Sequence, residues 1–115
     1  QNSKILLIGM AYKKNIDDYR ESPSLFIMDK LLLNKYFVDF HDNYIKKIGS
    51  NRHYLNLKNK KSIKISKSSI KKYDLVLILT DHDYIDYNKV QKNAKLIIDT
   101  RNAIKVKKNY NVIKM

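Results

Sequence analysis

Short, continuous runs of apolar residues rich in isoleucine, leucine and valine constrain the fold of this chain more than any other feature. Such runs are typical of strands that are covered on both faces. We expect strands at 4–10, 37–42, 62–66, 74–80 and 95–99, and a last edge strand at 111–115. The run at 74–80, DLVLILT, should be the most buried, whereas the alternation at 62–66 predicts a more exposed strand.

Helical stretches separate these runs. Ser22 is a good N-cap, and Pro23 suits the first helical position, where its missing N–H costs nothing. Apolar residues then recur with a helical period, so we expect a helix that starts at Pro23 and closes at Asn34-Lys35. Shorter helices are expected at 43–48, 68–72 and 86–93, and the lysine-rich stretch 51–61 is expected to be a mobile loop.

Strands that alternate with helices indicate parallel pairing with right-handed crossovers. We therefore predict an α/β fold, a single domain whose doubly wound, mostly parallel, Rossmann-like sheet has helices on both faces. In such sheets ligands bind beyond the carboxyl ends of the strands. The residues just after the expected strand ends are Tyr12, Lys13, Lys14, Asp42, Asp81, His82, Thr100 and Arg101.

The chain carries 24 Lys and Arg against 11 Asp and Glu, a formal net charge of +13 that is compatible with a nucleic-acid partner. We favour a solvated lysine surface instead. Almost all of the excess is lysine, and asparagine, isoleucine and tyrosine, which also have AT-rich codons, are abundant. The lysines are scattered, and aromatic residues do not interleave with them as in single-strand binders.

Other features of the composition exclude several classes of protein. The 115 residues contain no cysteine, so there is no disulfide, thiolate nucleophile or cysteine-based zinc site. No apolar run approaches the roughly 18 residues of a membrane span, so we expect no membrane association. A polar start leads directly into a strand, from which we expect no secretory leader and a cytoplasmic protein.

The stretch Gly9–Ser24, GMAYKKNIDDYRESPS, lies between the first strand and the capped helix. A dinucleotide-binding loop needs several glycines for its backbone to approach a pyrophosphate, and this stretch has one. It can bring side chains toward an anion instead. Tyr12 offers a ring for stacking on a base, and Lys13 and Lys14 offer charges for phosphate.

Arg20 adds a planar cation near the positive end of the following helix. The residues alone support a second interpretation equally well. In that interpretation the cations of the stretch simply pair, weakly and at the surface, with Asp17, Asp18 and Glu21.

Three blocks, GMAYKKNIDDYRESPS, LVLILTDHDYIDY and LIIDTRN, resemble the C-terminal, UDP-binding domain of the UDP-glucose/GDP-mannose dehydrogenase family. The resemblance spans about Lys4 to Ala103 with the blocks in the family's order, and 45–72 adds nothing to it. It implies that residues 1–115 are the UDP-sugar-binding C-terminal domain, a fragment of a larger dehydrogenase. Enzymes of this family oxidise C6 of a nucleotide sugar from alcohol to carboxylate in two NAD-dependent steps.

The resemblance also implies what the rest of the protein supplies. The family's N-terminal domain binds NAD, its central helical segment forms the dimer, and a cysteine outside the C-terminal domain forms a thioester. We therefore expect no catalytic residue here, an inactive fragment, NAD bound mainly by a domain absent from this chain, and a dimer at full length.

The resemblance implies binding roles for five residues. Tyr12 and Lys13 match the aromatic–lysine pair that contacts UDP, and Lys14 extends that pair. Arg20 matches the arginine that reaches across the domain cleft toward the bound NAD. Arg101 matches a basic position that contacts the nucleotide sugar in the neighbouring active site or in its own.

The motif Thr80–His82 is similar to that of UDP-N-acetylhexosamine dehydrogenases, and tryptophan, common in the UDP-glucose and GDP-mannose enzymes, is absent. This favours a UDP-N-acetylglucosamine or UDP-N-acetylmannosamine 6-dehydrogenase of surface polysaccharide synthesis. For His82 we favour a hydrogen bond with neighbouring backbone over a catalytic role. His41 and His53 lack metal-ligand partners at a telling spacing, so we expect no metal site.

Two other functions compete with this one. A stand-alone basic α/β module could bind RNA or acidic partners, and lysines gathered in one stripe would favour it. A receiver-type phospho-acceptor domain fits less well, because the acidic pair expected after its first strand is missing.

Overall fold

Strands and helices alternate along the chain in the structure, a computed structural model that describes residues 3–11, 13, 15, 19, 22–49, 57–105 and 111–115. In chain order the elements are β1 (Lys4–Ile8), α1 (Pro23–Leu33), β2 (Phe37–His41), α2 (Lys67–Lys71), β3 (Leu75–Ile78), α3 (Tyr87–Asn93), β4 (Ile97–Asp99) and β5 (Val112–Lys114). Each of the apolar runs except 62–66 contains one of these strands, so their positions are confirmed. The most buried of them is β1, where Leu6, Leu7 and Ile8 have no exposed surface, and not β3 as expected, because Leu75 and Leu77 are only partly buried.

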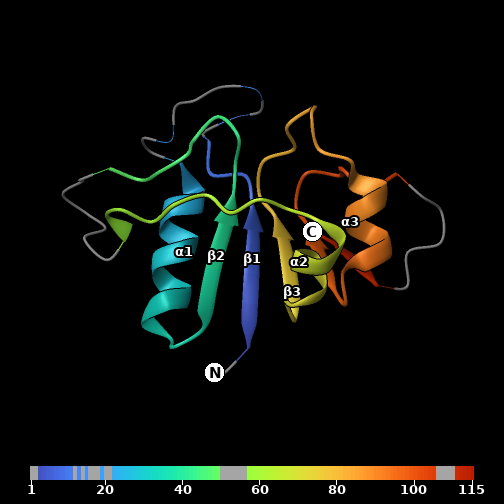
Figure 1. Cartoon of the computed structure of the whole chain (residues 1–115), viewed down its shortest axis with the longest axis horizontal. Coiled ribbons are helices and arrows are strands. Elements are labelled where there is room, and N and C mark those ends of the chain that lie inside the picture. The colour runs from blue at the N-terminus through green and yellow to red at the C-terminus, as the bar shows by residue number, and fades with distance from the viewer. Residues whose placement is uncertain are drawn as a thin grey trace.

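The described strands form one five-stranded sheet in the order β2-β1-β3-β4-β5. Every pairing between them is parallel; on β1, for example, Leu6 lies opposite Asp39 of β2 and Val76 of β3. In Figure 1 the arrowheads of β1, β2 and β3 point to the same end of the molecule. The carboxyl ends of the strands therefore share one edge of the sheet.

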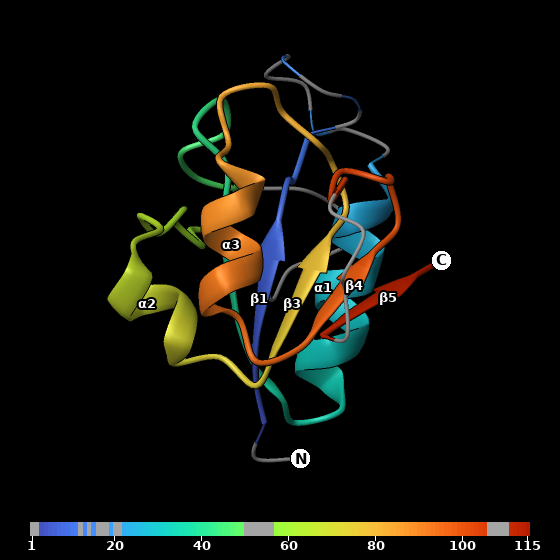
Figure 2. The same ribbon diagram turned by 90° about the vertical axis from the view of Figure 1, so that its right-hand side faces the viewer.

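An apolar core covers each face of the sheet. On β1, Leu7 belongs to the core that contains Leu25 of α1, whereas Leu6 belongs to the core that contains Ile70 of α2 and Val90 of α3. Figure 2 shows the same layers, with α1 on one face and α2 and α3 on the other. Successive side chains of a strand point to opposite faces, so two covered faces require a continuous apolar run. The predicted doubly wound fold is confirmed.

Polar side chains cap the helices at the predicted starts. Ser22 is buried, and its Oγ accepts the N–H of Ser24 at 3.2 Å, with Pro23 opening α1. The side chain of Asp86 accepts the N–H of Lys89 at 3.2 Å and begins α3. The helices expected at 68–72 and 86–93 are confirmed as α2 and α3.

The helix expected at 43–48 is absent, and that prediction is wrong. The backbone groups of this segment pair with a distant stretch and not with one another. Ile48 donates its N–H to the carbonyl of Lys60 at 2.8 Å, and Ser62 donates its N–H to the carbonyl of Lys46 at 2.8 Å. Residues 51–56 of the loop expected at 51–61 lie outside the described residues, and Leu57, which follows them, is fully buried.

The prediction of a strand at 62–66 is also wrong. Ser62 forms only an isolated parallel bridge with Phe40, and Ile63 donates its N–H to the carbonyl of Phe40 at 2.8 Å. Beyond this point Ser66 caps α2, which turns the chain away from the sheet. The apolar side chains of Ile63 and Ile65 pack against the core without a ladder of their own.

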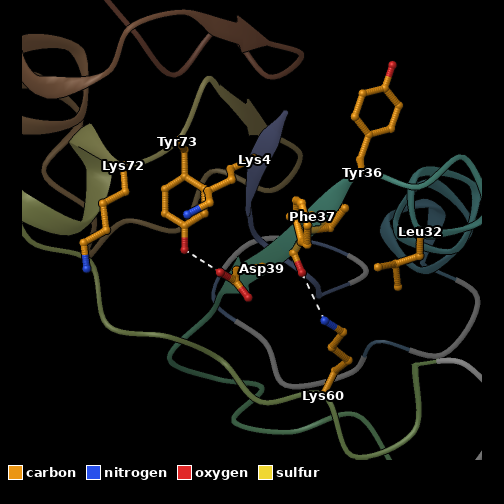
Figure 3. Close-up of a pocket in the computed structure, with 9 residues that line it drawn as sticks. Lys4, Leu32, Tyr36, Phe37, Asp39, Lys60, Lys72 and Tyr73 are labelled. Carbon is orange, nitrogen blue, oxygen red and sulfur yellow. Dashed lines mark hydrogen bonds between the residues drawn. The ribbon is translucent and has the colours of Figure 1, made fainter. Parts of the chain in front are cut away.

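β2 is an edge strand, and the 60–63 segment covers its outer side. Lys60 Nζ donates to the carbonyl of Val38 at 3.1 Å (Figure 3), next to the Ile63 bond to Phe40. Covered backbone groups cannot pair with another chain, so this edge is protected against aggregation.

A cavity of about 390 Å³ lies beside this edge, at the amino ends of the strands. Lys4 and Phe37, which begin β1 and β2, line it together with Asp39 and Tyr73 (Figure 3). The Tyr73 hydroxyl donates to Asp39 at 2.6 Å, and burial together with this carboxylate raises the pKa of Tyr73. The cavity is at the opposite end of the sheet from Lys13 and Arg101.

Candidate functional site

The carboxyl edge of the sheet carries those predicted residues that the structure describes. Lys13 follows β1, Asp81 follows β3 and Arg101 follows β4, so the parallel strands place all three at one edge, as expected. Lys13 and Arg101 are exposed. The other predicted site residues, Tyr12, Lys14 and Arg20, lie outside the described residues.

A buried carboxylate holds the start of the loop after β1, here called the Lys13 loop and described at Met10, Ala11, Lys13 and Asn15. Asp42, which follows β2, has no exposed surface. Its Oδ2 accepts the N–H groups of Met10 and Ala11 at 2.8 and 3.2 Å.

The other oxygen of Asp42 shapes its own strand end. Oδ1 accepts the N–H groups of Tyr44 and Ile45 at 2.9 and 3.2 Å. The carboxylate therefore ties the chain after β2 to the chain after β1.

His82, in the loop after β3, contacts both Asp42 and the Lys13 loop. Its Nε2 lies 2.8 Å from Asp42 Oδ2, and neither side chain has exposed surface. Its Nδ1 accepts the N–H of Asn15 at 2.6 Å, which confirms the predicted bond with backbone. Burial raises the pKa of Asp42, but the hydrogen bonds from His82 and Met10 outweigh it and hold the pKa below its usual value. Asp42 is therefore an anion at neutral pH.

Gly9 permits the loops after β1 and β3 to touch. Its φ is +95°, and a Cβ there would lie 2.4 Å from Cβ and 2.6 Å from N of Thr80. Only glycine fits such a position. The Thr80 hydroxyl donates to the carbonyl of Ala11 at 2.9 Å, which fixes the contact.

A second buried carboxylate, Asp99 at the end of β4, shapes the loop that carries Arg101. Its Oδ1 accepts the N–H groups of Arg101 and Ala103 at 3.0 and 3.1 Å, and its Oδ2 accepts that of Ile104 at 2.9 Å. Lys114 Nζ, from β5, donates to Oδ2 at 2.7 Å. Burial raises the pKa of Asp99, but the bonds from Lys114 and the three N–H groups hold it below its usual value.

The side chain of Arg101 extends over the end of β3. Its Nε donates to the carbonyl of Leu79 at 2.8 Å, and β3 lies between β1 and β4 in the sheet. Among the described residues no carboxylate forms an ion pair with Arg101. Because β1 and β4 are two strand spacings apart, the chain segments that carry Lys13 and Arg101 leave the sheet about 10 Å apart.

In the described part of the Lys13 loop, the backbone N–H groups of Met10, Ala11 and Asn15 are already committed to Asp42 and His82. Pyrophosphate-binding loops present uncommitted N–H groups at the start of a helix. Here Met10 and Ala11 donate theirs to Asp42, and Ser24 of α1 donates its N–H to Ser22. The described residues therefore do not fit the pyrophosphate of NAD, and an anion at this edge would meet the exposed cations Lys13 and Arg101.

A cavity of about 370 Å³ opens at the same edge beside Tyr84. The Tyr84 hydroxyl accepts the N–H of Asn43 at 2.8 Å and donates to His41 Nε2 at 2.9 Å, and His41 Nδ1 donates to the carbonyl of Ile63 at 2.7 Å. Burial lowers the pKa of His41 and raises that of Tyr84 to about 12, so both are neutral at pH 7.

Within the described part of the chain, no group of three or more His, Cys, Asp or Glu side chains is placed to hold a metal ion. His41 has a structural role through its two hydrogen bonds, and His53 lies outside the described residues.

The sequence identifies Asp42 only as a strand-end residue, and it draws no attention to Asp99 or Asn15. One signal could have found the two carboxylates. Each follows or ends an apolar run, FVDFHD or LIID, where a buried charge must be satisfied by several donors.

A doubly wound sheet with cations at the carboxyl edge is typical of nucleotide-binding α/β domains. A family model described as the UDP-glucose/GDP-mannose dehydrogenase family, UDP binding domain, matches residues 6–106. The chain therefore belongs to the UDP-glucose/GDP-mannose dehydrogenase family, which confirms the resemblance.

Individual relatives agree with this placement. Over 112 residues the chain is 29% identical to a UDP-N-acetyl-D-mannosamine dehydrogenase of Methanococcus aeolicus, a match that covers 90% of the chain and 23% of the relative. It is similar to the structure of the UDP-D-ManNAc dehydrogenase of Pyrococcus horikoshii, with 25% identity and a TM-score of 0.68 over 98% of the chain and 25% of that protein. The NDP-N-acetyl-D-galactosaminuronic acid dehydrogenase of Methanosarcina mazei shares the fold, with 21% identity and a TM-score of 0.74 over 100% of the chain and 24% of that protein.

The chain spans about a quarter of the length of these relatives. Among its described residues, no helix has the length and apolar character needed to cross a bilayer.

Proposed function

We propose that the carboxyl edge binds the UDP part of a nucleotide sugar. The observation that carries this proposal is the pair of exposed cations, Lys13 and Arg101, on loops anchored by the buried carboxylates Asp42 and Asp99. The guanidinium suits a planar, two-oxygen contact with phosphate, and the lysine acts as a point charge. By the resemblance, Tyr12 adds a ring that stacks on the base.

The same resemblance gives Lys14 a further contact with the nucleotide and Arg20 a contact with NAD. The cofactor itself is held mainly by a domain outside this chain, since the described residues of the Lys13 loop do not fit its pyrophosphate.

The finer activity that we propose is that of an NAD-dependent UDP-N-acetylhexosamine 6-dehydrogenase. This enzyme oxidises C6 of the sugar to a uronic acid for surface polysaccharide synthesis. The names of the relatives and the motif Thr80–His82 support this choice. Because the chain has no cysteine, the thioester-forming residue must also lie elsewhere, and the 115-residue chain alone is inactive. We place the complete enzyme in the cytoplasm as a dimer formed through its central domain.

The net charge of +13 favours a second candidate, a module that binds RNA or acidic partners. The distribution of exposed lysines weakens it. They include Lys30 on α1, Lys71 on α2, Lys92 on α3 and Lys4 at the amino end of the sheet, so both faces and both ends carry them. A solvated lysine surface explains this spread better than one binding footprint.

Titration of UDP, NAD and a short RNA into ¹⁵N-labelled protein tests the two functions. UDP should shift the signals of Lys13 and Arg101 with millimolar affinity, about −4 kcal/mol, because this chain is proposed to supply only part of the site. Added salt should weaken this binding, since phosphate charge carries much of it. NAD should leave the loop signals unchanged.

The variant Arg101→Gln should lower UDP affinity, whereas Lys30→Ala, which removes an exposed lysine from α1, should leave it unchanged. The proposal fails if Arg101→Gln binds UDP like the wild type. It also fails if RNA shifts lysines on both faces more strongly than UDP shifts Lys13.

A further inference from the structure

His82 is a buried imidazole that does not itself reach the exposed edge. Its side chain has no exposed surface, its Nε2 lies 2.8 Å from Asp42, and its Nδ1 lies 2.6 Å from the N of Asn15. The rings of Tyr44 and Tyr84 pack around it, with centroids 4.8 and 5.6 Å from its own. The imidazole therefore bridges a buried anion after β2 and the backbone of the Lys13 loop.

The two hydrogen bonds determine which nitrogen of His82 carries the proton. A backbone N–H can only donate, so Nδ1, which faces Asn15, must be the accepting nitrogen. A carboxylate can only accept, so Nε2 carries the proton that Asp42 receives. A doubly protonated ring would set two donors, Nδ1–H and the Asn15 N–H, against each other. The bridge thus requires the neutral imidazole with its proton on Nε2.

Asn15 fixes the far side of the Lys13 loop. Its φ of +61° lies in the left-handed region, which asparagine tolerates. Its side chain forms a reciprocal pair with Asp83: Nδ2 donates to Oδ2 at 2.6 Å, and Oδ1 accepts the Asp83 N–H at 3.0 Å. On the near side, Met10 is held by Asp42. Lys13 therefore lies between two anchored points, and His82 connects them.

We propose that His82 is a positioning residue for nucleotide binding. Its neutral imidazole ties Asn15 to Asp42 and so holds Lys13 where the diphosphate of the nucleotide is received. The proposal rests on the proposed function, because it takes UDP as the ligand. A loop that is ordered before binding loses little conformational entropy when the ligand arrives, so the bridge raises affinity without touching the ligand.

Two variants separate this role from simple packing. His82→Gln keeps a donor for Asp42 and an acceptor for Asn15, whereas His82→Leu removes both and leaves an apolar side chain of similar size. We expect His82→Leu to weaken UDP binding about tenfold, the effect of about one hydrogen bond, and His82→Gln to stay within about twofold of the wild type. In the ligand-free state, the Asn15 amide should be protected from hydrogen exchange in the wild type and His82→Gln and should lose protection in His82→Leu.

The wild-type protein supplies a test that requires no variant. With ¹⁵N-labelled histidine, a long-range ¹H–¹⁵N spectrum should show His82 protonated at Nε2 and unprotonated at Nδ1. A ¹⁵N–¹⁵N coupling across the hydrogen bond should connect Nδ1 with the Asn15 amide. A proton on Nδ1 at neutral pH overturns the proposal, even if His82→Leu does not fold.

The failure of this proposal and the failure of the proposed function give different results. If the wild type does not bind UDP, the proposed function fails, and the tautomer and exchange data still decide whether the bridge exists. If the wild type binds UDP and His82→Leu binds it equally well, the positioning role fails while UDP binding stands. Equal losses of UDP affinity in His82→Gln and His82→Leu also overturn it. His82→Gln keeps both hydrogen bonds, so a loss as large as that of His82→Leu would mean that packing matters and the hydrogen bonds do not.

Discussion

Replacement of Asp42 by asparagine should be the most damaging isosteric change at the carboxyl edge. The substitution keeps the size of the side chain and removes its charge and one acceptor. Asp42 is fully buried, so no water can replace a lost partner. The number of donors around it then sets the cost.

Five donors converge on this carboxylate: the N–H groups of Met10, Ala11, Tyr44 and Ile45, and Nε2 of His82. Asparagine has a single acceptor oxygen. In its less damaging orientation this oxygen replaces Oδ2, and the NH₂ group then faces the donors of Tyr44 and Ile45. Two donors left unpaired cost about 1–3 kcal/mol each, and the remaining bonds lose their charge assistance. We expect Asp42→Asn to lower the free energy of unfolding by about 4 kcal/mol.

Urea denaturation followed by circular dichroism measures this loss. Asp39→Asn is a matched control on β2, because Asp39 accepts one described hydrogen bond, from Tyr73, which an asparagine oxygen can also accept. The control should change stability by less than about 1 kcal/mol. If Asp42→Asn and Asp39→Asn unfold at the same urea concentration, the convergence of donors on Asp42 does not stabilise the fold as argued.

Three further changes test other parts of the structure. Gly9→Ala should destabilise by about 3 kcal/mol or more, because a positive φ and a Cβ against Thr80 are both unfavourable, and an unchanged thermal midpoint would contradict this close approach. Ser22→Ala should cost about 1 kcal/mol through loss of the cap on Ser24, and a urea midpoint equal to that of the wild type would indicate that α1 starts elsewhere. The pKa of Asp99 lies below its usual 3.8, so its contribution to stability is present above that pH and is lost as the pH falls through the lowered value. Asp99→Asn should therefore flatten the decline of stability between about pH 5 and pH 2, and parallel pH profiles would refute this.

The sequence predicts well those elements whose determinants lie within a few residues of one another. The run at 74–80 is apolar because both faces of β3 are covered, and Ser22 with Pro23 marks the start of α1 locally. The predictions for the segments 43–48 and 62–66 are wrong because the determinants of these segments lie far away in the sequence. Their backbone groups pair across long sequence separations, in the bridges of Lys47 with Lys61 and of Phe40 with Ser62.

The features of the candidate site also divide into those that the sequence predicts and those that it does not. A parallel sheet places every carboxyl end at one edge, so the shared location of Lys13 and Arg101 follows from the order of elements alone. The contacts that hold these residues do not follow from the order of elements. His82 meets Asp42 across 40 positions and Asn15 across 67, and no periodicity of strand or helix encodes such a meeting.

If the carboxyl edge binds a nucleotide as proposed, the two buried carboxylates favour recognition of the anion through side chains. Asp42 and Asp99 take up the backbone N–H groups that follow β1 and β4, the groups that a glycine-rich loop would present to phosphate. Under the proposed function, the buried anions hold the loops, and the exposed cations Lys13 and Arg101 contact the ligand. Because different residues perform the two tasks, a change of an exposed cation should alter affinity and its salt dependence while stability stays nearly constant. A change of a buried carboxylate should alter stability first, and affinity only through the loop that it holds.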